Sequence, residues 1–194
     1  MNAHRSSIAD APLRAFGEAL RRARARKLLF RRVAIAASVA VSVLGWTAFF
    51  PPSPRLIWNA SASAPPGLWL VSPGSRILRG DMAIARMPKP WRRFAAARGY
   101  LPEQVPLVKR VTAIPGDEIC GLGQRIFLNG KPLVARVNRD AKQRWLPWWE
   151  GCSRLRKGEY LLLMADNPRS FDGRYFGVTK ASEIIGSARL IWAR

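Results

Sequence analysis

The chain has 194 residues, a net charge of +21 at pH 7 and 48% hydrophobic residues, so it holds enough apolar material for a packed core. The length fits one domain with an additional segment, and the hydrophobic content excludes a wholly disordered chain. The single histidine is His4, so no later position supplies an imidazole. This excludes, for the rest of the chain, a Ser-His-Asp triad, a Cys-His pair and a histidine-rich zinc site. We therefore expect neither a metal nor another cofactor, and any enzymatic base is a lysine or a carboxylate.

The first 32 residues are strongly basic, with nine Lys and Arg against two Asp and Glu. Residues 33–50, VAIAASVAVSVLGWTAFF, carry no charge, and as a helix they would span ~27 Å, enough to cross a membrane. A buried core helix and a cleavable signal peptide are alternatives for this run. We predict a cytoplasmic tail at 1–32, a transmembrane helix at 33–50 and an external domain at 51–194, because basic segments stay on the cytoplasmic side.

The two cysteines, Cys120 and Cys152, both fall in the predicted external domain. Disulfides persist in the periplasm of a Gram-negative cell, so a bridge between them is expected there. Two unpaired buried thiols are the alternative. Their spacing does not suggest a metal site, because no CxxC pair or nearby histidine accompanies them.

Short runs of alternating apolar and polar residues, separated by Gly, Pro, Asn and Asp, follow the apolar segment. This pattern predicts a mainly β, antiparallel fold, with a short helix at 91–99. A tight hairpin is predicted at Asn129-Gly130, because a type I′ turn needs positive φ at both positions. The predicted strands are 67–72, 81–87, 105–114, 117–120, 125–128, 131–134, 160–165 and 184–192.

One lysine occupies an unusual position in this pattern. Alternation over 105–114 places Lys109 on the same face as Leu107 and Val111. A lysine among apolar neighbours loses its proton more readily, and an amine with a pKa near 7–8 can act as a general base. A surface lysine at a strand edge, with its ammonium in water, is the structural alternative.

A serine in the segment after the apolar run is the candidate nucleophile. Ser63 precedes Pro65 and Pro66, which restrict the backbone, and we expect an extended stretch that presents its hydroxyl and nearby amides to a carbonyl oxygen. An ordinary polar linker is the alternative here.

A third cluster lies near the C-terminus. If residues 165–177 are extended, Ser170, Asp172 and Arg174 share one face and can form an ion pair and a hydroxyl contact. An ordinary Asp/Asn/Pro loop is the alternative for this segment.

Taken in order, these motifs resemble the signal peptidase I superfamily of serine–lysine membrane peptidases, and within it the TraF-type conjugative-transfer branch. The resemblance covers the chain from about residue 59 to the C-terminus. It rests on Ser-x-Pro-x-Gly-Leu-aromatic, on Arg-Gly-Tyr-Leu-Pro followed by Lys-Arg-Val-x-Ala-x-Pro-Gly-Asp, and on Ser-Phe-Asp-x-Arg-Tyr-Phe-Gly. These stand at residues 63–69, 98–102, 109–117 and 170–177.

The resemblance implies that Ser63 is the nucleophile and Lys109 its general base. It also implies that the Ser61 hydroxyl and the Ser63 amide hold the oxyanion. Ala64 departs from the family pattern, since general signal peptidases usually have Met there, and this weakens a housekeeping assignment more than it weakens the chemistry.

For the third cluster, the resemblance implies that Ser170 orients the lysine, while Asp172 supports the site through Arg174. Two further departures fall here: Ala165 stands where Gly is common, and Gly173 where Ser is common.

The expected function is that of an inner-membrane, single-pass endopeptidase with its catalytic domain in the periplasm. It would process a conjugative pilin precursor or another secreted precursor, and the resemblance permits head-to-tail cyclisation of the pilin. Expected partners are this substrate, inner-membrane lipids and the conjugative transfer machinery, but no nucleic acid. A general type I signal peptidase and a non-catalytic basic membrane protein for conjugation assembly are the alternatives.

Overall fold

The structure is a computed structural model that describes residues 11–50 and 53–194, and the chain divides into two compact units, Met1–Pro52 and Ser53–Arg194. The first unit contains helix α2 (Ala11–Phe49). It is the one helix in the described ranges that is long and apolar enough to cross a membrane, by length and composition. Residues 1–10 of the predicted tail, together with Pro51 and Pro52, lie outside the described residues.

The helix extends well beyond the predicted span 33–50, because the described part of the basic segment before it is helical as well. Ala, Leu and Arg dominate this segment, and all three are strong helix formers. An exposed pair between Arg22 and Glu18, at 3.4 Å and one turn apart, adds a small contribution.

The second unit is built on a seven-stranded sheet in which every neighbouring pair of strands is antiparallel. In spatial order its strands are β1 (Leu56–Asn59), β2 (Gly67–Pro73), β11 (Ile184–Ala193), β3 (Met82–Ala85), β4 (Leu107–Ala113), β9 (Glu159–Leu163) and β10 (Thr179–Lys180).

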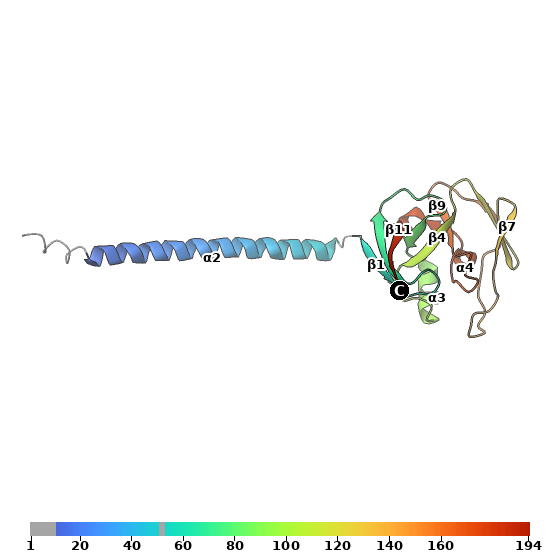
Figure 1. The fold of residues 1–194 in the computed structure, drawn as a ribbon, viewed down its shortest axis with the longest axis horizontal. Coiled ribbons are helices and arrows are strands. Elements are labelled where there is room, and N and C mark those ends of the chain that lie inside the picture. The colour runs from blue at the N-terminus through green and yellow to red at the C-terminus, as the bar shows by residue number, and fades with distance from the viewer. Residues whose placement is uncertain (1–10, 51–52) are drawn as a thin grey trace, which may run out of the picture. The chain divides into compact units, whose positions relative to one another are not determined.

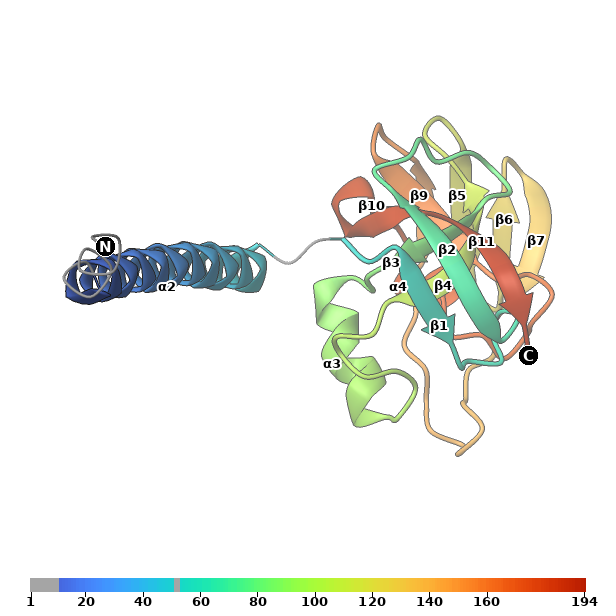
Figure 2. The ribbon, with the colours of Figure 1, turned by 60° about the vertical axis from the view of Figure 1, so that its left-hand side comes forward.

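A second antiparallel sheet has four strands, in the order β7 (Lys131–Ala135), β6 (Arg125–Leu128), β5 (Glu118–Leu122) and β8 (Gly151–Arg154). Three short helical segments complete this unit: α3 (Lys89–Ala97), α4 (Gly173–Phe176) and the 3-10 turn η1 (Ala181–Glu183). Figure 2 shows β1, β2 and β11 side by side, with β5, β6 and β7 further from β1 and α3 at one end of the unit. The predicted mainly β, antiparallel fold is therefore confirmed (Figure 1).

Most predicted elements are present, with ends that differ by a few residues. The predicted helix 91–99 is α3, which begins earlier because Pro90 fits the first helical turn. The hairpin is confirmed, since Asn129 and Gly130 have φ of 50° and 76°. Three strands were not predicted, namely β1, β8 and β10. Their sequences, LIWN, GCSR and TK, lack the alternation of apolar and polar residues on which the prediction depends.

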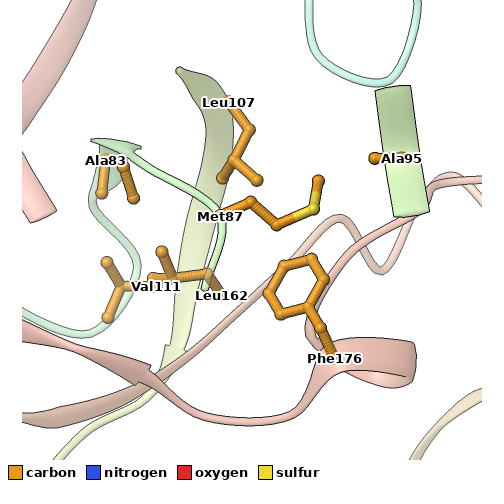
Figure 3. Packing of buried hydrophobic residues seen from close by; sticks show 8 residues of the cluster. Ala83, Met87, Ala95, Leu107, Val111, Leu162 and Phe176 are labelled. Atoms are coloured by element: carbon orange, nitrogen blue, oxygen red, sulfur yellow. The ribbon is translucent and has the colours of Figure 1, made fainter. Parts of the chain in front are cut away.

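The core consists of three groups of buried side chains. One packs beneath α3 and α4 and includes Met87, Leu107, Val111 and Phe176 (Figure 3). The second contains Ala64, Trp69, Val71, Ile84, Val108 and Met164, and so includes a residue next to Ser63. The third joins the two sheets through residues of β4, β5, β6 and β9. Strand β4 contributes to all three groups, which places Lys109 in the middle of the core.

The two cysteines form a disulfide with an S–S distance of 2.04 Å. They are directly opposite each other in the β5–β8 pair, so the bond links neighbouring strands of the smaller sheet. The prediction of a bridge between Cys120 and Cys152 is confirmed, and the alternative of free thiols is wrong.

Candidate active site

Ser63 lies in a turn between β1 and β2, and not in the extended stretch that was predicted. Pro65 and Pro66 follow this turn and lead directly into β2. Gly67 is required at that point: its φ is 145°, and a Cβ there would lie 2.1 Å from the carbonyl oxygen of Trp192. The spacing Ser-x-Pro-x-Gly thus combines a turn that carries the hydroxyl with a close approach between two strands.

Lys109 reaches Ser63 from β4. Its Nζ lies 2.6 Å from the Ser63 Oγ, and the two atoms are hydrogen-bonded. The lysine is 3% exposed, whereas Ser63 is half-buried. The predicted position of Lys109 among apolar side chains is confirmed, because Leu107 and Val111 are both buried. A surface lysine, the structural alternative, is therefore wrong.

Burial lowers the pKa of Lys109 from 10.5 to about 8. Desolvation is the largest cause, since an ammonium in the core lacks the water that stabilises its charge. The carboxylate of Asp172 raises this pKa and the guanidinium of Arg174 lowers it. A large fraction of such an amine is neutral near pH 8, which is the form that can accept a proton.

The Ser61 hydroxyl lies beside the proposed nucleophile. Its Oγ is 2.9 Å from the Ser63 Oγ and accepts a hydrogen bond from the Ser63 N–H at 3.3 Å. The two groups expected to hold an oxyanion therefore lie together on one side of the turn. They bond to each other here, so a bound carbonyl oxygen would replace that bond.

Asp172 and Arg174 form a fully buried ion pair, with Nε 2.8 Å from Oδ1. The geometry differs from the extended segment that was predicted, because Asp172 caps the N-terminus of α4 and its Oδ1 accepts the Arg174 N–H. Its Oδ2 accepts the Met164 N–H, and the guanidinium also donates to the Met164 carbonyl. Since Met164 follows β9, the pair fixes α4 to the strand beside β4.

A glycine makes this close packing possible. A Cβ on Gly173 would lie 2.7 Å from the Leu162 carbonyl oxygen, so the serine that the resemblance leads one to expect at this position would not fit here. The departure at Gly173 therefore follows from the contact between α4 and β9.

Ser170 is 1% exposed, and its Oγ has no hydrogen-bond partner among residues 11–50 and 53–194. The expected contact with Lys109 is not formed in this structure, so the orienting role of Ser170 stays a prediction.

A buried arginine was missed by the sequence analysis. Arg136 is 1% exposed and donates to the carbonyls of Gly123 and Trp149 at 2.7 Å, to the Arg174 carbonyl at 3.4 Å and to the Glu150 carboxylate at 2.9 Å. It thus connects the smaller sheet to α4. No local pattern predicts this role, because its partners are distant in sequence.

Comparisons with known proteins show the family to which this chain belongs. The profile of the family described as signal peptidase, peptidase S26, matches residues 27–193. The chain belongs to this signal peptidase family.

Two relatives identify the branch. A plasmid transfer protein TraF of Escherichia coli is 31% identical over 145 residues, covering 69% of this chain and 82% of the relative. A conjugal transfer protein TraF of Agrobacterium fabrum is 30% identical over 144 residues, covering 69% and 80%. The chain is a TraF-type member of the signal peptidase I superfamily.

Among solved structures, a signal peptidase I of Enterococcus faecalis is similar, with a TM-score of 0.35 and 21% sequence identity. The likeness covers 58% of this chain and 97% of that one.

Proposed function

We propose that this peptidase is a membrane-anchored endopeptidase that processes a conjugative pilin precursor, or another secreted precursor, by acyl transfer through Ser63 and Lys109. The main support is the 2.6 Å contact between a buried amine and a half-buried hydroxyl. The relatives named for conjugal and plasmid transfer support the link to conjugation.

In the acylation step, neutral Lys109 accepts the proton of the Ser63 hydroxyl as Oγ attacks the carbonyl carbon of the scissile peptide bond. A tetrahedral oxyanion forms, and the Ser61 hydroxyl and the Ser63 N–H are the donors proposed to stabilise it. The carbon–nitrogen bond then breaks, and Lys109 returns the proton to the leaving amine. An ester between Ser63 and the precursor remains.

The second step decides the product. If Lys109 deprotonates a water molecule that attacks the ester, the precursor is cleaved and Ser63 is regenerated. If the N-terminal amine of the same chain attacks, a new peptide bond closes a circular product. Both routes use the same base and oxyanion donors, so the choice depends on which nucleophile reaches the ester.

Asp172 and Arg174 are proposed to support the base and not to touch the substrate. Their charges lie close enough to shift the pKa of Lys109 in opposite directions. A buried pair that is satisfied by the backbone holds both charges in place, so the lysine experiences a fixed electrostatic environment. Ser170 is proposed to orient the Lys109 amine as the proton moves.

The proposed location is the inner membrane, with a cytoplasmic N-terminus and a periplasmic domain. Basic residues before the apolar run and a disulfide in the domain support this orientation.

Neighbouring strands β1, β2 and β11 also expose Leu56, Trp58, Leu70 and Trp192, and the two tryptophan rings lie 5.5 Å apart. Tryptophans of this kind favour the lipid interface. In proteoliposomes, lipids with brominated acyl chains should quench a smaller fraction of the tryptophan fluorescence when Trp58 and Trp192 are both replaced by serine.

The test is co-expression of the full chain with the candidate pilin precursor, followed by mass spectrometry of the pilin. The wild type should give a shortened product, linear or circular, whereas Ser63→Ala and Lys109→Met should leave the precursor intact. Lys157→Met, at an exposed position, is the matched control and should process normally. Normal processing by either site variant would disprove the proposed dyad. Rescue of a host strain depleted of its leader peptidase would favour a general signal peptidase.

A further inference from the structure

Asn59, the last residue of β1, is buried at 7% exposure although its side chain is polar. Its carboxamide makes four hydrogen bonds, all within the turn that follows. The Nδ2 group lies 3.0 Å from the Ser61 carbonyl oxygen and 3.1 Å from the carbonyl oxygens of Ala64 and Pro65. The Oδ1 atom accepts the Ser61 N–H at 3.1 Å. One side chain therefore binds the turn on both sides of Ser63.

This arrangement requires an amide. The turn presents three carbonyl oxygens, which need a donor, and one N–H, which needs an acceptor. Asparagine supplies both from a planar group, whereas aspartate supplies only acceptors. The reverse orientation of the amide would place Oδ1 against three oxygens, so the hydrogen bonds themselves fix it.

Two further side chains bind the same turn. The Asn167 Nδ2 donates to the Ala62 carbonyl at 3.3 Å, and the Trp69 indole donates to the Pro65 carbonyl at 3.2 Å. Side chains thus take the place of regular secondary structure here. Asn59 differs from the other two because it also binds the backbone of Ser61, whose hydroxyl lies 2.9 Å from the Ser63 Oγ.

We infer that Asn59 is a positioning residue for the nucleophile: its carboxamide holds the Ser61–Ser63 hydroxyl pair at the distance and angle that Lys109 requires. The inference rests on the proposed role of Ser63. Within residues 53–194, no hydrogen bond joins the Asn59 side chain to Lys109 or to the Ser63 Oγ, so we expect it to affect the rate through geometry and not through the pKa of the base. Displacement of a reacting group by ~1 Å can lower a rate by about 100-fold.

The test uses the full chain in detergent micelles with 4-nitrophenyl acetate, a small ester that isolates the reactivity of Ser63 from recognition of a precursor. Mass spectrometry of the acetylated Ser63 peptide gives the rate of acylation. Asn59→Asp keeps the size of the side chain and the acceptor but removes the donor. We expect a fall of about tenfold or more. The neutral variant Asn59→Ala, which adds no charge near the amine, should react more slowly with no change in the pH at which the rate is half-maximal.

Asn129→Asp is the matched control. Asn129 also accepts a backbone N–H, from Glu118 at 2.8 Å, and donates to a side chain, Asp117 at 3.0 Å, but in the distant hairpin. This variant should lose stability and keep the wild-type rate of acylation. A rate that fell equally in both variants would show a general effect of destabilisation and overturn the inference.

A double-mutant cycle separates positioning from other effects. If Asn59 acts through Ser61, the variant Asn59→Ala with Ser61→Ala should react no more slowly than the slower of the two single variants. Wild-type rates in Asn59→Asp, independent losses in the cycle, or variants unfolded at the assay temperature would each overturn the inference. Failure of the proposed function would look different: the wild type itself would give no acetylated Ser63 peptide.

Discussion

The low pKa of Lys109 has a consequence for stability that is independent of any substrate. Because the pKa falls from 10.5 to about 8 on folding, the protonated amine destabilises the folded state by about 3 kcal/mol at about pH 7. Lys109→Met replaces the amine with an uncharged side chain of similar length. We therefore expect this variant to be more stable than the wild type at that pH, by up to about 3 kcal/mol.

The sign of the pH dependence follows from proton binding. Between about pH 8 and 10.5 the unfolded chain holds a proton that the folded chain has lost, so the wild type gains stability as the pH rises. Below about pH 8 the Lys109 amine is protonated in both the folded and the unfolded chain, so the full destabilisation of the folded state remains. The advantage of Lys109→Met should therefore shrink as the pH increases and vanish near 10.5.

The assay is guanidinium unfolding of the full chain in detergent micelles, followed by tryptophan fluorescence at about pH 7 and about pH 10.5. Other groups also titrate in this range, so the relevant quantity is the difference between variant and wild type at each pH. Lys157→Met is the control, and its difference should be small and equal at both values, because the side chain is exposed. An equal difference for Lys109→Met at both pH values would refute the argument.

Three further predictions concern the surroundings of this lysine. Asp172→Asn should lower the pH of half-maximal acylation, because the carboxylate raises the pKa of Lys109; an unchanged pH–rate profile would contradict this. Replacing Cys120 and Cys152 by serine should reduce the free energy of unfolding by about 3–4 kcal/mol, measured by denaturant titration, because the bond closes a loop with a sequence separation of 32. Arg136→Met should cost about 3 kcal/mol in the same titration, since three carbonyls and the Glu150 carboxylate lose a buried charged donor.

Sequence patterns predicted the features that depend on local alternation. The position of Lys109 followed from period-2 alternation in one strand, because β4 buries the whole face that carries Leu107, Lys109 and Val111 and exposes Arg110 on the other. The hairpin at Asn129-Gly130 followed equally directly, because few residues tolerate positive φ at both positions.

Features that depend on contacts between distant segments were not predictable in this way. The turn that carries Ser63 was expected to be extended from its prolines, but the side chains of Asn59 and Asn167 determine its shape. The partners of Arg136 are likewise spread over two loops of the smaller sheet and helix α4, and only the folded chain brings them together.

The ion pair of Asp172 and Arg174 is an intermediate case. The sequence indicated the two partners from their spacing of two residues. It did not indicate that they close a helical turn, because that conformation depends on Gly173 packing against β9.

The pH dependence of Ser63 acetylation by 4-nitrophenyl acetate in the full chain tests the proposed mechanism most directly. We predict a rate that rises to a plateau with its midpoint near pH 8, set by the pKa of Lys109, and that disappears in Ser63→Ala. A rate still climbing in proportion to hydroxide at pH 10.5, or one unaffected by Lys109→Met, would show that the buried amine is not the base.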